Sequence, residues 1–338
     1  MKNQQIVFTK KDTAELLECP MEALKPDQVL VQTVISTISN GTERANITGN
    51  PNVSIDAAGK VSFPRYVGYS SSGIIVAKGE AVTELELGDR VAVSGGYHKS
   101  YNVLPRERVI KIVNDSISFE EAAIYQIGTF PMAALRKTRL ELGESALVMG
   151  LGILGLLAVQ FARAAGAVPV IAADPVRERR ETALALGADY ALDPTEPGFA
   201  EQVKKLSGGG IKAAIEVTGL GIGLDQTLDC MAKFGRVALL GCTRSSDFTI
   251  DYYRKVHGPG ITLIGAHTNA RPKEESYPGW FTMRDDIQAQ MQLSAMGRID
   301  LKKMIFETHS PAECTEVFDR LVNDRAFPPV VQFDWRQL

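Results

Sequence analysis

Residues 145–167 read Ser-Ala-Leu-Val-Met-Gly-Leu-Gly-Ile-Leu-Gly-Leu-Leu-Ala-Val-Gln-Phe-Ala-Arg-Ala-Ala-Gly-Ala, and this stretch decides the fold. The apolar residues 146–149 predict a buried strand, and apolar residues with helical spacing follow the glycines Gly150, Gly152 and Gly155. A glycine triplet between a strand and a helix is typical of a turn that binds a dinucleotide, because free N–H groups at the helix start hold the phosphates. The residues expected to contact the dinucleotide at this turn are Gly150, Leu151, Gly152, Ile153, Leu154 and Gly155.

A second apolar run ends in Asp174, about twenty residues after the last glycine of the turn. A carboxylate at this position accepts hydrogen bonds from the adenosine ribose and repels a 2′-phosphate, which favours NAD over NADP. The arginines that follow, among them Arg179, leave NADP open as an alternative, because an arginine can also bind a 2′-phosphate. We therefore expect NAD as the cofactor, with Asp174 and Arg179 among its contacts.

Length and composition are those of a globular enzyme. The chain has 338 residues, which favours two domains, and 45% of them are hydrophobic. A formal net charge of −3 gives no reason to expect a nucleic acid or an anionic membrane as partner. No apolar run reaches the roughly 20 residues that span a bilayer. The four cysteines lack metal-site spacing, so we expect reduced thiols in a cytoplasmic protein without a four-cysteine zinc lobe.

The pattern of elements changes along the chain. Up to about residue 110, short strands alternate with glycine turns, which predicts a distorted antiparallel barrel. After residue 145, strands alternate with helices, which predicts a parallel sheet with right-handed crossovers. The final strand, residues 329–335, does not extend this alternation, so we expect it to return to the first domain.

The sequence resembles the medium-chain dehydrogenase/reductase superfamily over nearly its whole length. The resemblance implies an α/β fold, in which a Rossmann doubly wound parallel sheet joins a GroES-like distorted β-barrel catalytic domain. It places the catalytic domain at residues 1–126 and 268–338, and the NAD-binding domain at residues 127–267. The stretches that carry it are Leu87-Gly-Asp-Arg-Val-Ala-Val, residues 146–160, Leu186-Gly-Ala-Asp, Glu216-Val-Thr-Gly and residues 234–241.

The resemblance also implies further contacts and a partner. In relatives, residues after the fourth and fifth Rossmann strands line the NAD cleft, and the residue after the last strand lies near the nicotinamide. The last strand, around residues 262–265, pairs across a dimer in relatives, so we expect a homodimer. The corresponding residues here are Val217, Thr218, Gly219, Gly241, Cys242 and His267.

Three positions depart from the zinc alcohol dehydrogenases of this superfamily. Where those enzymes hold zinc with cysteine, histidine and a third ligand, this chain has Ser39, Tyr69 and Gln126. A hydroxyl, a phenol and an amide are poor substitutes for a thiolate and an imidazole, so we expect no metal. The segment Gly41-Thr-Glu43 is similar to the zinc-lacking branch that includes bacteriochlorophyllide hydroxyethyl dehydrogenase.

Without a metal, a side chain must stabilise the substrate oxygen and handle its proton. The candidates are Tyr69, Glu43 and His98, and each has a structural alternative: a core tyrosine, a helix-capping carboxylate and a surface-loop histidine. The aromatic stretch at residues 277–281 is open to two interpretations, a wall of the substrate site or a hydrophobic anchor.

The sequence predicts a zinc-independent, NAD-dependent oxidoreductase that interconverts a secondary alcohol and a ketone, with a polyol, a sugar or a similar polar small molecule as substrate. One alternative keeps the fold but reduces a quinone or an enone, a reaction that NADPH preference would favour. Another is a non-catalytic dinucleotide-binding protein, for which NAD would bind without turnover.

Overall fold

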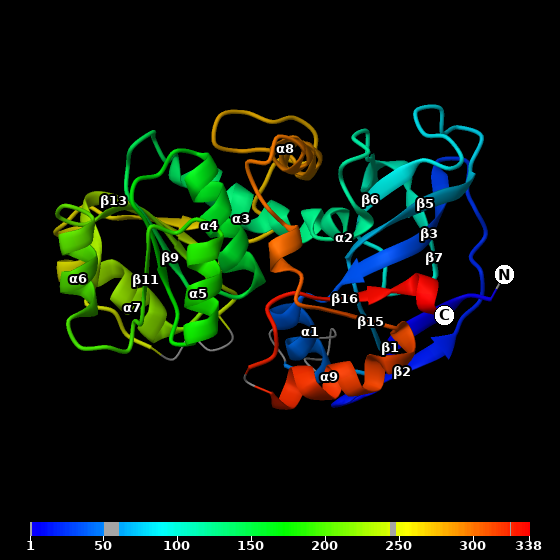
Figure 1. The fold of residues 1–338 in the computed structure, drawn as a ribbon, viewed down its shortest axis with the longest axis horizontal. Helices are drawn as coiled ribbons and strands as arrows, with labels where there is room; N and C mark the ends of the chain where they lie inside the picture. Colours follow the sequence, from blue (N-terminus) through cyan, green and yellow to red (C-terminus); the bar gives the residue numbers. More distant parts are fainter. Residues whose placement is uncertain (1, 51–60, 244–247, 325) are drawn as a thin grey trace. The chain divides into compact units, whose positions relative to one another are not determined.

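The computed structural model describes residues 2–50, 61–243, 248–324 and 326–338 (Figure 1). These residues form two compact units. The first unit runs to Ile127 and includes Gln290–Ala295 and Leu301–Leu338, and the second comprises Gly128–Ala289 and Met296–Asp300.

The chain leaves the second unit later than the sequence suggested. Residues 268–289, which the sequence analysis assigned to the return segment, belong to the second unit. Arg271 and Asp286 account for this difference, because the Arg271 guanidinium donates to the Thr129 carbonyl at 2.7 Å and the Asp286 carboxylate binds Arg136 at 3.0 Å. These contacts keep residues 268–289 on the second unit. They join residues that are far apart in sequence, so a local sequence pattern does not predict them.

The second unit is built on six parallel strands in the order β11-β10-β9-β12-β13-β14. Counted along the chain, this is the order 3-2-1-4-5-6 of a Rossmann sheet. The strands are β9 (Ala146–Met149), β10 (Val170–Ala173), β11 (Tyr190–Leu192), β12 (Ile211–Glu216), β13 (Met231–Leu239) and β14 (Thr262–Gly265). The helices wholly within this unit are α4 (Ile153–Ala164), α5 (Arg177–Ala185), α6 (Phe199–Leu206) and α7 (Gly221–Asp229), and α3 (Tyr125–Thr138) belongs to it from Gly128 and α8 (Met283–Ala295) up to Ala289.

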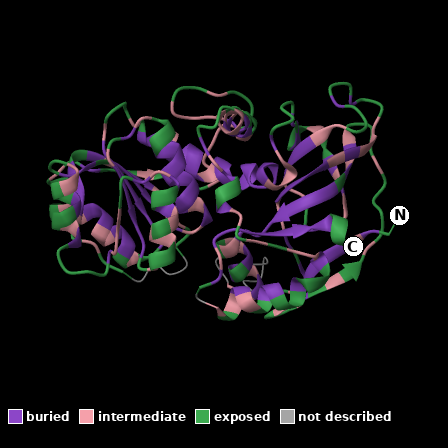
Figure 2. Cartoon of the chain, viewed as in Figure 1, coloured by how far each residue is buried: buried purple, intermediate pink, exposed green. Residues whose placement is uncertain are grey.

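Helix packing explains why the central strands are continuous apolar runs. Every residue of β9 and β10 is buried, as Figure 2 shows in purple. α4 packs on both strands, and α7 packs on β9, β12 and β13. A parallel sheet covered in this way needs apolar residues on both faces, which removes the alternation seen in a half-exposed strand. Among the described residues, no helix is both long and apolar enough to cross a membrane.

The first unit is mainly antiparallel. One sheet has the order β15-β16-β3-β5-β6-β8, with β7 also paired to β3, and a smaller sheet has the order β2-β1-β4. Together with the Rossmann sheet, this confirms the expected α/β fold with a separate GroES-like domain. The strands are β1 (Gln4–Lys10), β2 (Thr13–Glu18), β3 (Gln28–Thr37), β4 (Arg65–Tyr66), β5 (Ser70–Lys78), β6 (Arg90–Ser94), β7 (Tyr101–Pro105), β8 (Val109–Lys111), β15 (Glu307–His309) and β16 (Val331–Asp334), and the helices are α1 (Asn40–Ile47), α2 (Phe119–Ala122) and α9 (Cys314–Asn323).

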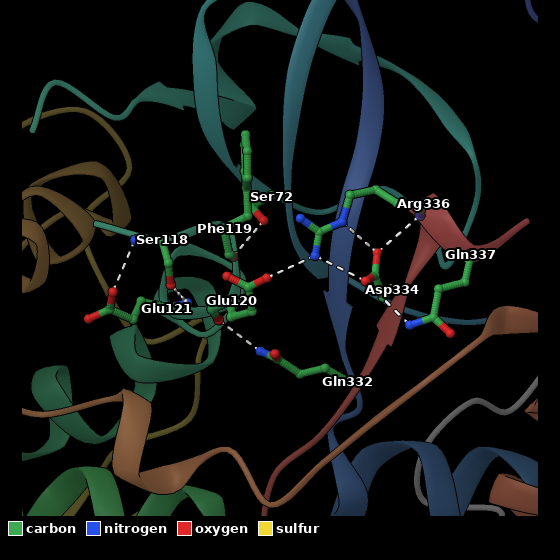
Figure 3. Close-up of polar contacts among 9 residues, drawn as sticks. All are labelled: Ser72, Ser118, Phe119, Glu120, Glu121, Gln332, Asp334, Arg336 and Gln337. Atoms are coloured by element: carbon green, nitrogen blue, oxygen red, sulfur yellow. Dashed lines mark hydrogen bonds and ion pairs between the residues drawn. The ribbon is translucent and has the colours of Figure 1, made fainter. Parts of the chain in front are cut away.

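The C-terminal strand returns to the first unit, as the sequence predicted, and there it pairs with β3. Figure 3 shows how side chains of this strand and of the turn after it hold α2: Gln332 donates to the Glu120 carbonyl at 2.8 Å, and Arg336 binds the Glu120 carboxylate at 3.0 Å. α2 begins with a capping box, in which Ser118 and Glu121 each bond the backbone N–H of the other. The end of the chain is thus fixed to a segment more than 200 residues earlier.

Candidate functional site

All the residues predicted to bind the dinucleotide lie at or after the carboxyl ends of the parallel strands. β9 and β12 are neighbours in the sheet although β10 and β11 lie between them in the sequence, which makes their ends the topological switch point. Ligands of open α/β sheets bind in the crevice outside this point. The residues that follow the strands here are Gly150, Asp174, Val217, Gly241 and His267.

The glycine turn has the geometry of a phosphate cradle. Gly150 has a φ of +97°, and a Cβ on Gly155 would lie 1.9 Å from the Gly150 carbonyl oxygen. A Cβ on Gly152 would meet no atom within 4 Å, and Gly152 starts α4 without a side-chain cap. The helix therefore begins with open space and uncapped N–H groups. Leu151 and Ile153 are buried, and a cofactor contact at either stays a prediction.

Asp174 joins the end of β10 to the glycine turn. Its carboxylate accepts the N–H of Leu151 at 2.8 Å and the N–H of Val176 at 2.8 Å. The Arg179 guanidinium lies 3.8 Å from the same carboxylate, whereas Arg180 bonds the carbonyls of residues 174 and 175 and the side chain of Asp193. Each carboxylate oxygen keeps a lone pair that a ribose hydroxyl can use.

Glu216, a residue that the sequence analysis missed, organises the next turn. This buried carboxylate accepts the N–H of Thr218 at 2.7 Å, the Thr218 hydroxyl and the N–H of Gly219 at 3.2 Å. Burial raises the pKa of Glu216 above its ordinary value. A Cβ on Gly241 would lie 2.2 Å from the Gly219 nitrogen, so the two turns approach each other closely. The available signal was an acidic residue at the end of an otherwise apolar strand.

The remaining predicted cofactor residues are exposed. Cys242 follows β13 as a free thiol. His267 follows β14, and its Nδ1 accepts the N–H of Asn269 at 3.2 Å. The positions of both residues agree with the strand-end expectation, while a cofactor contact at either stays a prediction.

A separate cavity of about 410 Å³ lies at the opposite, amino end of the sheet. Its lining includes Leu142, Ser145, Gly209 and Lys212, which flank the starts of β9 and β12. None of the predicted cofactor residues lines it.

The aromatic stretch at residues 277–281 serves as an anchor within the second unit. The Arg136 guanidinium lies 3.6 Å from the Phe281 ring centroid, and the Lys137 ammonium lies 4.8 Å from the Trp280 ring. Both cations belong to α3, and Arg136 also binds Asp286 at 3.0 Å. These stacked contacts favour the anchor interpretation over a free substrate wall.

In the first unit, Tyr69 and Ser39 meet. The Tyr69 phenol donates to Ser39 Oγ at 2.5 Å, although 30 residues separate them in sequence. Ser39 follows β3 and precedes α1, while Tyr69 precedes β5. Gly68 has a φ of +94°, and a Cβ there would lie 2.4 Å from the His98 nitrogen. This close approach fixes the backbone beside Tyr69.

Glu43 and His98 form a buried pair behind Ser39. Their exposed fractions are 1% and 0%, so neither reaches solvent. His98 Nε2 lies 3.1 Å from the Glu43 carboxylate, and His98 Nδ1 lies 2.7 Å from Ser36 Oγ. The ring of His98 packs against Phe318 and Phe333, with centroid distances of 6.4 and 5.6 Å. His98 is therefore a core residue, neither on a surface loop nor placed to touch a substrate.

The donors at the three departing positions do not fit a zinc ion. Ser39 and Tyr69 bond each other, and Gln126 is a buried amide in the first turn of α3. Zinc sites in proteins use thiolate, imidazole or carboxylate, and a neutral hydroxyl, phenol and amide supply none of these. Within the described residues, histidine, cysteine and acidic side chains form no group of three that could hold a metal.

Comparisons with known proteins point to one family. The alcohol dehydrogenase GroES-like domain matches residues 25–117, and the zinc-binding dehydrogenase domain matches residues 154–282. The chain is similar to an L-threonine 3-dehydrogenase of Pyrococcus horikoshii, with 30% identity over 285 residues, 75% of this chain and 79% of the relative. It is also 25% identical to a D-guloside 3-dehydrogenase of Escherichia coli over 300 residues, 83% of this chain and 85% of the relative.

A solved structure shares the whole fold. A short chain alcohol dehydrogenase from Escherichia coli, in complex with NADH, superposes with a TM-score of 0.83 at 18% identity and covers 99% of both chains. At this identity the likeness concerns the fold alone.

Proposed function

Because the chain belongs to the zinc-type medium-chain dehydrogenase/reductase superfamily, we propose that it is an NAD-dependent oxidoreductase that interconverts a secondary alcohol and a ketone without a catalytic zinc ion. The observation that carries the zinc-free part is the 2.5 Å hydrogen bond from Tyr69 to Ser39. These two hydroxyls stand at positions where zinc-dependent relatives hold ligands, and they supply a proton donor in place of a Lewis acid.

The residues of the second unit fit a nicotinamide dinucleotide. The open space beside Gly152 and the uncapped start of α4 suit the pyrophosphate, and Asp174 suits the adenosine ribose. The bound dinucleotide supplies the acceptor or donor of a hydride. The Asp174 carboxylate favours NAD, because a 2′-phosphate beside it would meet a like charge.

The first unit supplies the groups that act on the substrate oxygen. In the reducing direction, the carbonyl carbon gains a hydride and the Tyr69 phenol donates its proton to the carbonyl oxygen, which yields the alcohol. In the resting state Ser39 Oγ accepts a hydrogen bond from the Tyr69 phenol, and its own hydroxyl can donate to the same substrate oxygen during the reaction. Oxidation of the alcohol reverses both transfers. The buried pair of Glu43 and His98 cannot touch the substrate, so we assign it no direct proton transfer.

Secondary alcohols with further polar groups are the proposed substrate class. The relatives named above act at the 3-position of threonine and of a guloside, both of which are secondary carbinols. A polyol or a sugar derivative carries the same group.

An exposed edge strand supports a homodimer. β14 ends the Rossmann sheet, and Leu263 on it is 38% exposed. An apolar edge strand tends to pair with another chain, and two-fold pairing of identical edges closes the assembly. The four free cysteines support a reducing compartment such as the cytoplasm.

Initial rates over a panel of secondary alcohols and ketones test this proposal. We expect turnover with NAD or NADH on at least one polyol or sugar derivative, and slower turnover with the phosphorylated cofactor. Faster reduction of quinones or enones with NADPH would instead assign the reaction to carbon–carbon double bonds. Tight NAD binding without turnover across the whole panel would indicate a non-catalytic protein.

A further inference from the structure

Ser39 is held in an unusual way for a residue that starts a helix. A serine at this position normally uses its hydroxyl to accept an N–H of the first helical turn. Here no such bond forms, and the hydroxyl accepts the Tyr69 phenol instead. The Ser39 N–H donates to the Glu43 carboxylate at 3.0 Å, and the Glu43 N–H donates to the Ser39 carbonyl at 2.8 Å. Glu43 therefore fixes the backbone of Ser39 on both sides of its side chain.

Glu43 is in turn oriented by a chain of hydrogen bonds through the core. The Trp335 indole donates to Ser36 Oγ at 2.9 Å, and an indole N–H cannot accept. Ser36 Oγ also lies 2.7 Å from His98 Nδ1. An ionised carboxylate can only accept, so His98 Nε2, which lies 3.1 Å from Glu43, donates to it. The Nε2–H of His98 and the backbone N–H of Ser39 therefore both point toward Glu43.

We propose that Glu43, oriented by His98, is a positioning residue that holds Ser39 in place as an acceptor of the Tyr69 phenol and so orients that phenol. The inference rests on the proposed function of Tyr69 as proton donor. A buried network of this kind needs every polar group satisfied, whereas apolar side chains would fill the space beside Phe318 and Phe333 without that requirement. The carboxylate of Glu43 has a specific role at this buried position, because it accepts the Ser39 N–H.

A double-mutant cycle tests whether Glu43 acts through Tyr69. We expect Glu43→Gln to lower kcat by about tenfold with little change in KM, because the acceptor of the phenol loses its fixed position. In a Tyr69→Phe background the same substitution should lower kcat by about twofold or less, since no phenol is left to position. Equal losses of kcat in the two backgrounds would overturn the proposal and leave Glu43 a structural residue.

A second Glu–His pair in the same unit provides the control. Glu307 binds His309 Nε2 at 2.8 Å and also binds Arg320. Glu307→Gln should lower Tm without changing kcat, which separates a general loss of stability from a loss of positioning. If Glu43→Gln does not fold, His98→Gln replaces it in the cycle, because an amide N–H can still donate to the Glu43 carboxylate and is expected to restore part of kcat relative to His98→Ala.

An NMR measurement tests the positioning without reference to turnover. The ¹³Cζ signal of labelled tyrosine reports the hydrogen bond of each phenol, and Tyr69→Phe identifies the Tyr69 signal by its loss. We expect Glu43→Gln to shift or broaden this signal, and Glu307→Gln to leave it unchanged. An unchanged Tyr69 signal in Glu43→Gln would overturn the positioning role even if the enzyme turns over alcohols. A shifted signal in a protein that turns over no alcohol would overturn only the proposed function.

Discussion

The two proposed functional regions of this chain differ in what forms them, mainly backbone in one and side chains in the other. The dinucleotide end of the second unit consists mainly of backbone: three glycines, an uncapped helix start and two acidic side chains that bind backbone N–H groups. The Tyr69–Ser39 region of the first unit consists of side chains that come from distant parts of the chain. A site formed by backbone tolerates substitutions wherever the new Cβ meets neither the protein nor the ligand. A site formed by side chains depends on every residue of its hydrogen-bond network.

The largest effect is expected at the side-chain site. Tyr69→Phe removes one hydroxyl and should lower kcat about 100-fold, because a positioned general acid contributes on this scale. The dissociation constant of NAD should change by less than about twofold, since the substitution leaves the second unit intact. Steady-state kinetics and NAD titration check both values. Tyr66→Phe, at a tyrosine that is 55% exposed, is the matched control. Unchanged turnover in Tyr69→Phe would remove the phenol from the mechanism.

At the backbone site, two alanine substitutions should separate folding from binding. A Cβ on Gly155 meets the Gly150 carbonyl, so Gly155→Ala should lower the free energy of unfolding by about 1–3 kcal/mol even without cofactor. A Cβ on Gly152 meets nothing in the free protein, so Gly152→Ala should keep its stability but weaken NAD binding by about tenfold. Urea unfolding measures the stability of both variants, and calorimetric titration measures their affinity for NAD. Normal NAD affinity in Gly152→Ala would place the pyrophosphate elsewhere.

The cofactor preference should depend on Asp174. Asp174→Ala removes the ribose acceptor and the negative charge, so the affinity ratio of NAD to NADP should fall by about tenfold. Fluorescence titration with both reduced cofactors gives the ratio. Asp189→Ala is a suitable control, because Asp189 also accepts a backbone N–H, from Val170 at 2.7 Å, but at the amino end of β10. An equal loss of both affinities in Asp174→Ala would contradict the NAD assignment.

The smallest expected effect is a difference in how stability depends on pH between Glu216, a buried acid at the carboxyl end of the Rossmann sheet, and Glu144, an acid at its amino end. Burial raises the pKa of Glu216, so the native state binds this proton more tightly than the unfolded chain does. The stability of the wild type relative to Glu216→Gln should therefore decline as pH rises from about 4 to 7. Glu144, at the amino end, should change stability with pH in the opposite direction. Burial acts to raise the pKa of Glu144, but the hydrogen bond from Arg236 lowers it overall. Relative to Glu144→Gln, the wild type should gain stability as pH rises. Urea unfolding at several pH values measures both stability differences. If the two differences changed with pH in the same direction, this expectation would be contradicted.

Local patterns predicted the strands and turns that form the backbone site, and dinucleotide binding at that site stays a prediction. The glycine triplet, the strands on either side of it and Asp174 were all identified from spacing, because each depends on neighbours within about thirty residues. The paired strands of the first unit were also expected, including the C-terminal strand that returns to β3. These features follow from hydrophobic periodicity and from turn residues, both of which can be read from the sequence without knowledge of tertiary contacts.

The side-chain site was only partly predicted. Tyr69, Glu43 and His98 were each named, but the sequence did not indicate that Glu43 and His98 are buried against each other or that Tyr69 donates to Ser39. Glu216 was missed because an acidic residue after an apolar strand is indistinguishable by pattern from one that faces water. The sequence placed the start of the return segment at residue 268 instead of 290, because contacts from Arg271 to Thr129 and from Asp286 to Arg136 hold the preceding residues and such contacts follow no local rule.

The central claim is that the reaction proceeds without zinc, and assay of metal-stripped protein tests it most directly. The protein is dialysed against a strong chelator, its zinc content is measured, and NAD-dependent oxidation of the best secondary alcohol is followed before and after zinc is added back. The account predicts undiminished kcat at far less than one zinc per chain, and no gain on addition of zinc. Loss of activity with the metal, restored by about one zinc per chain, would contradict it.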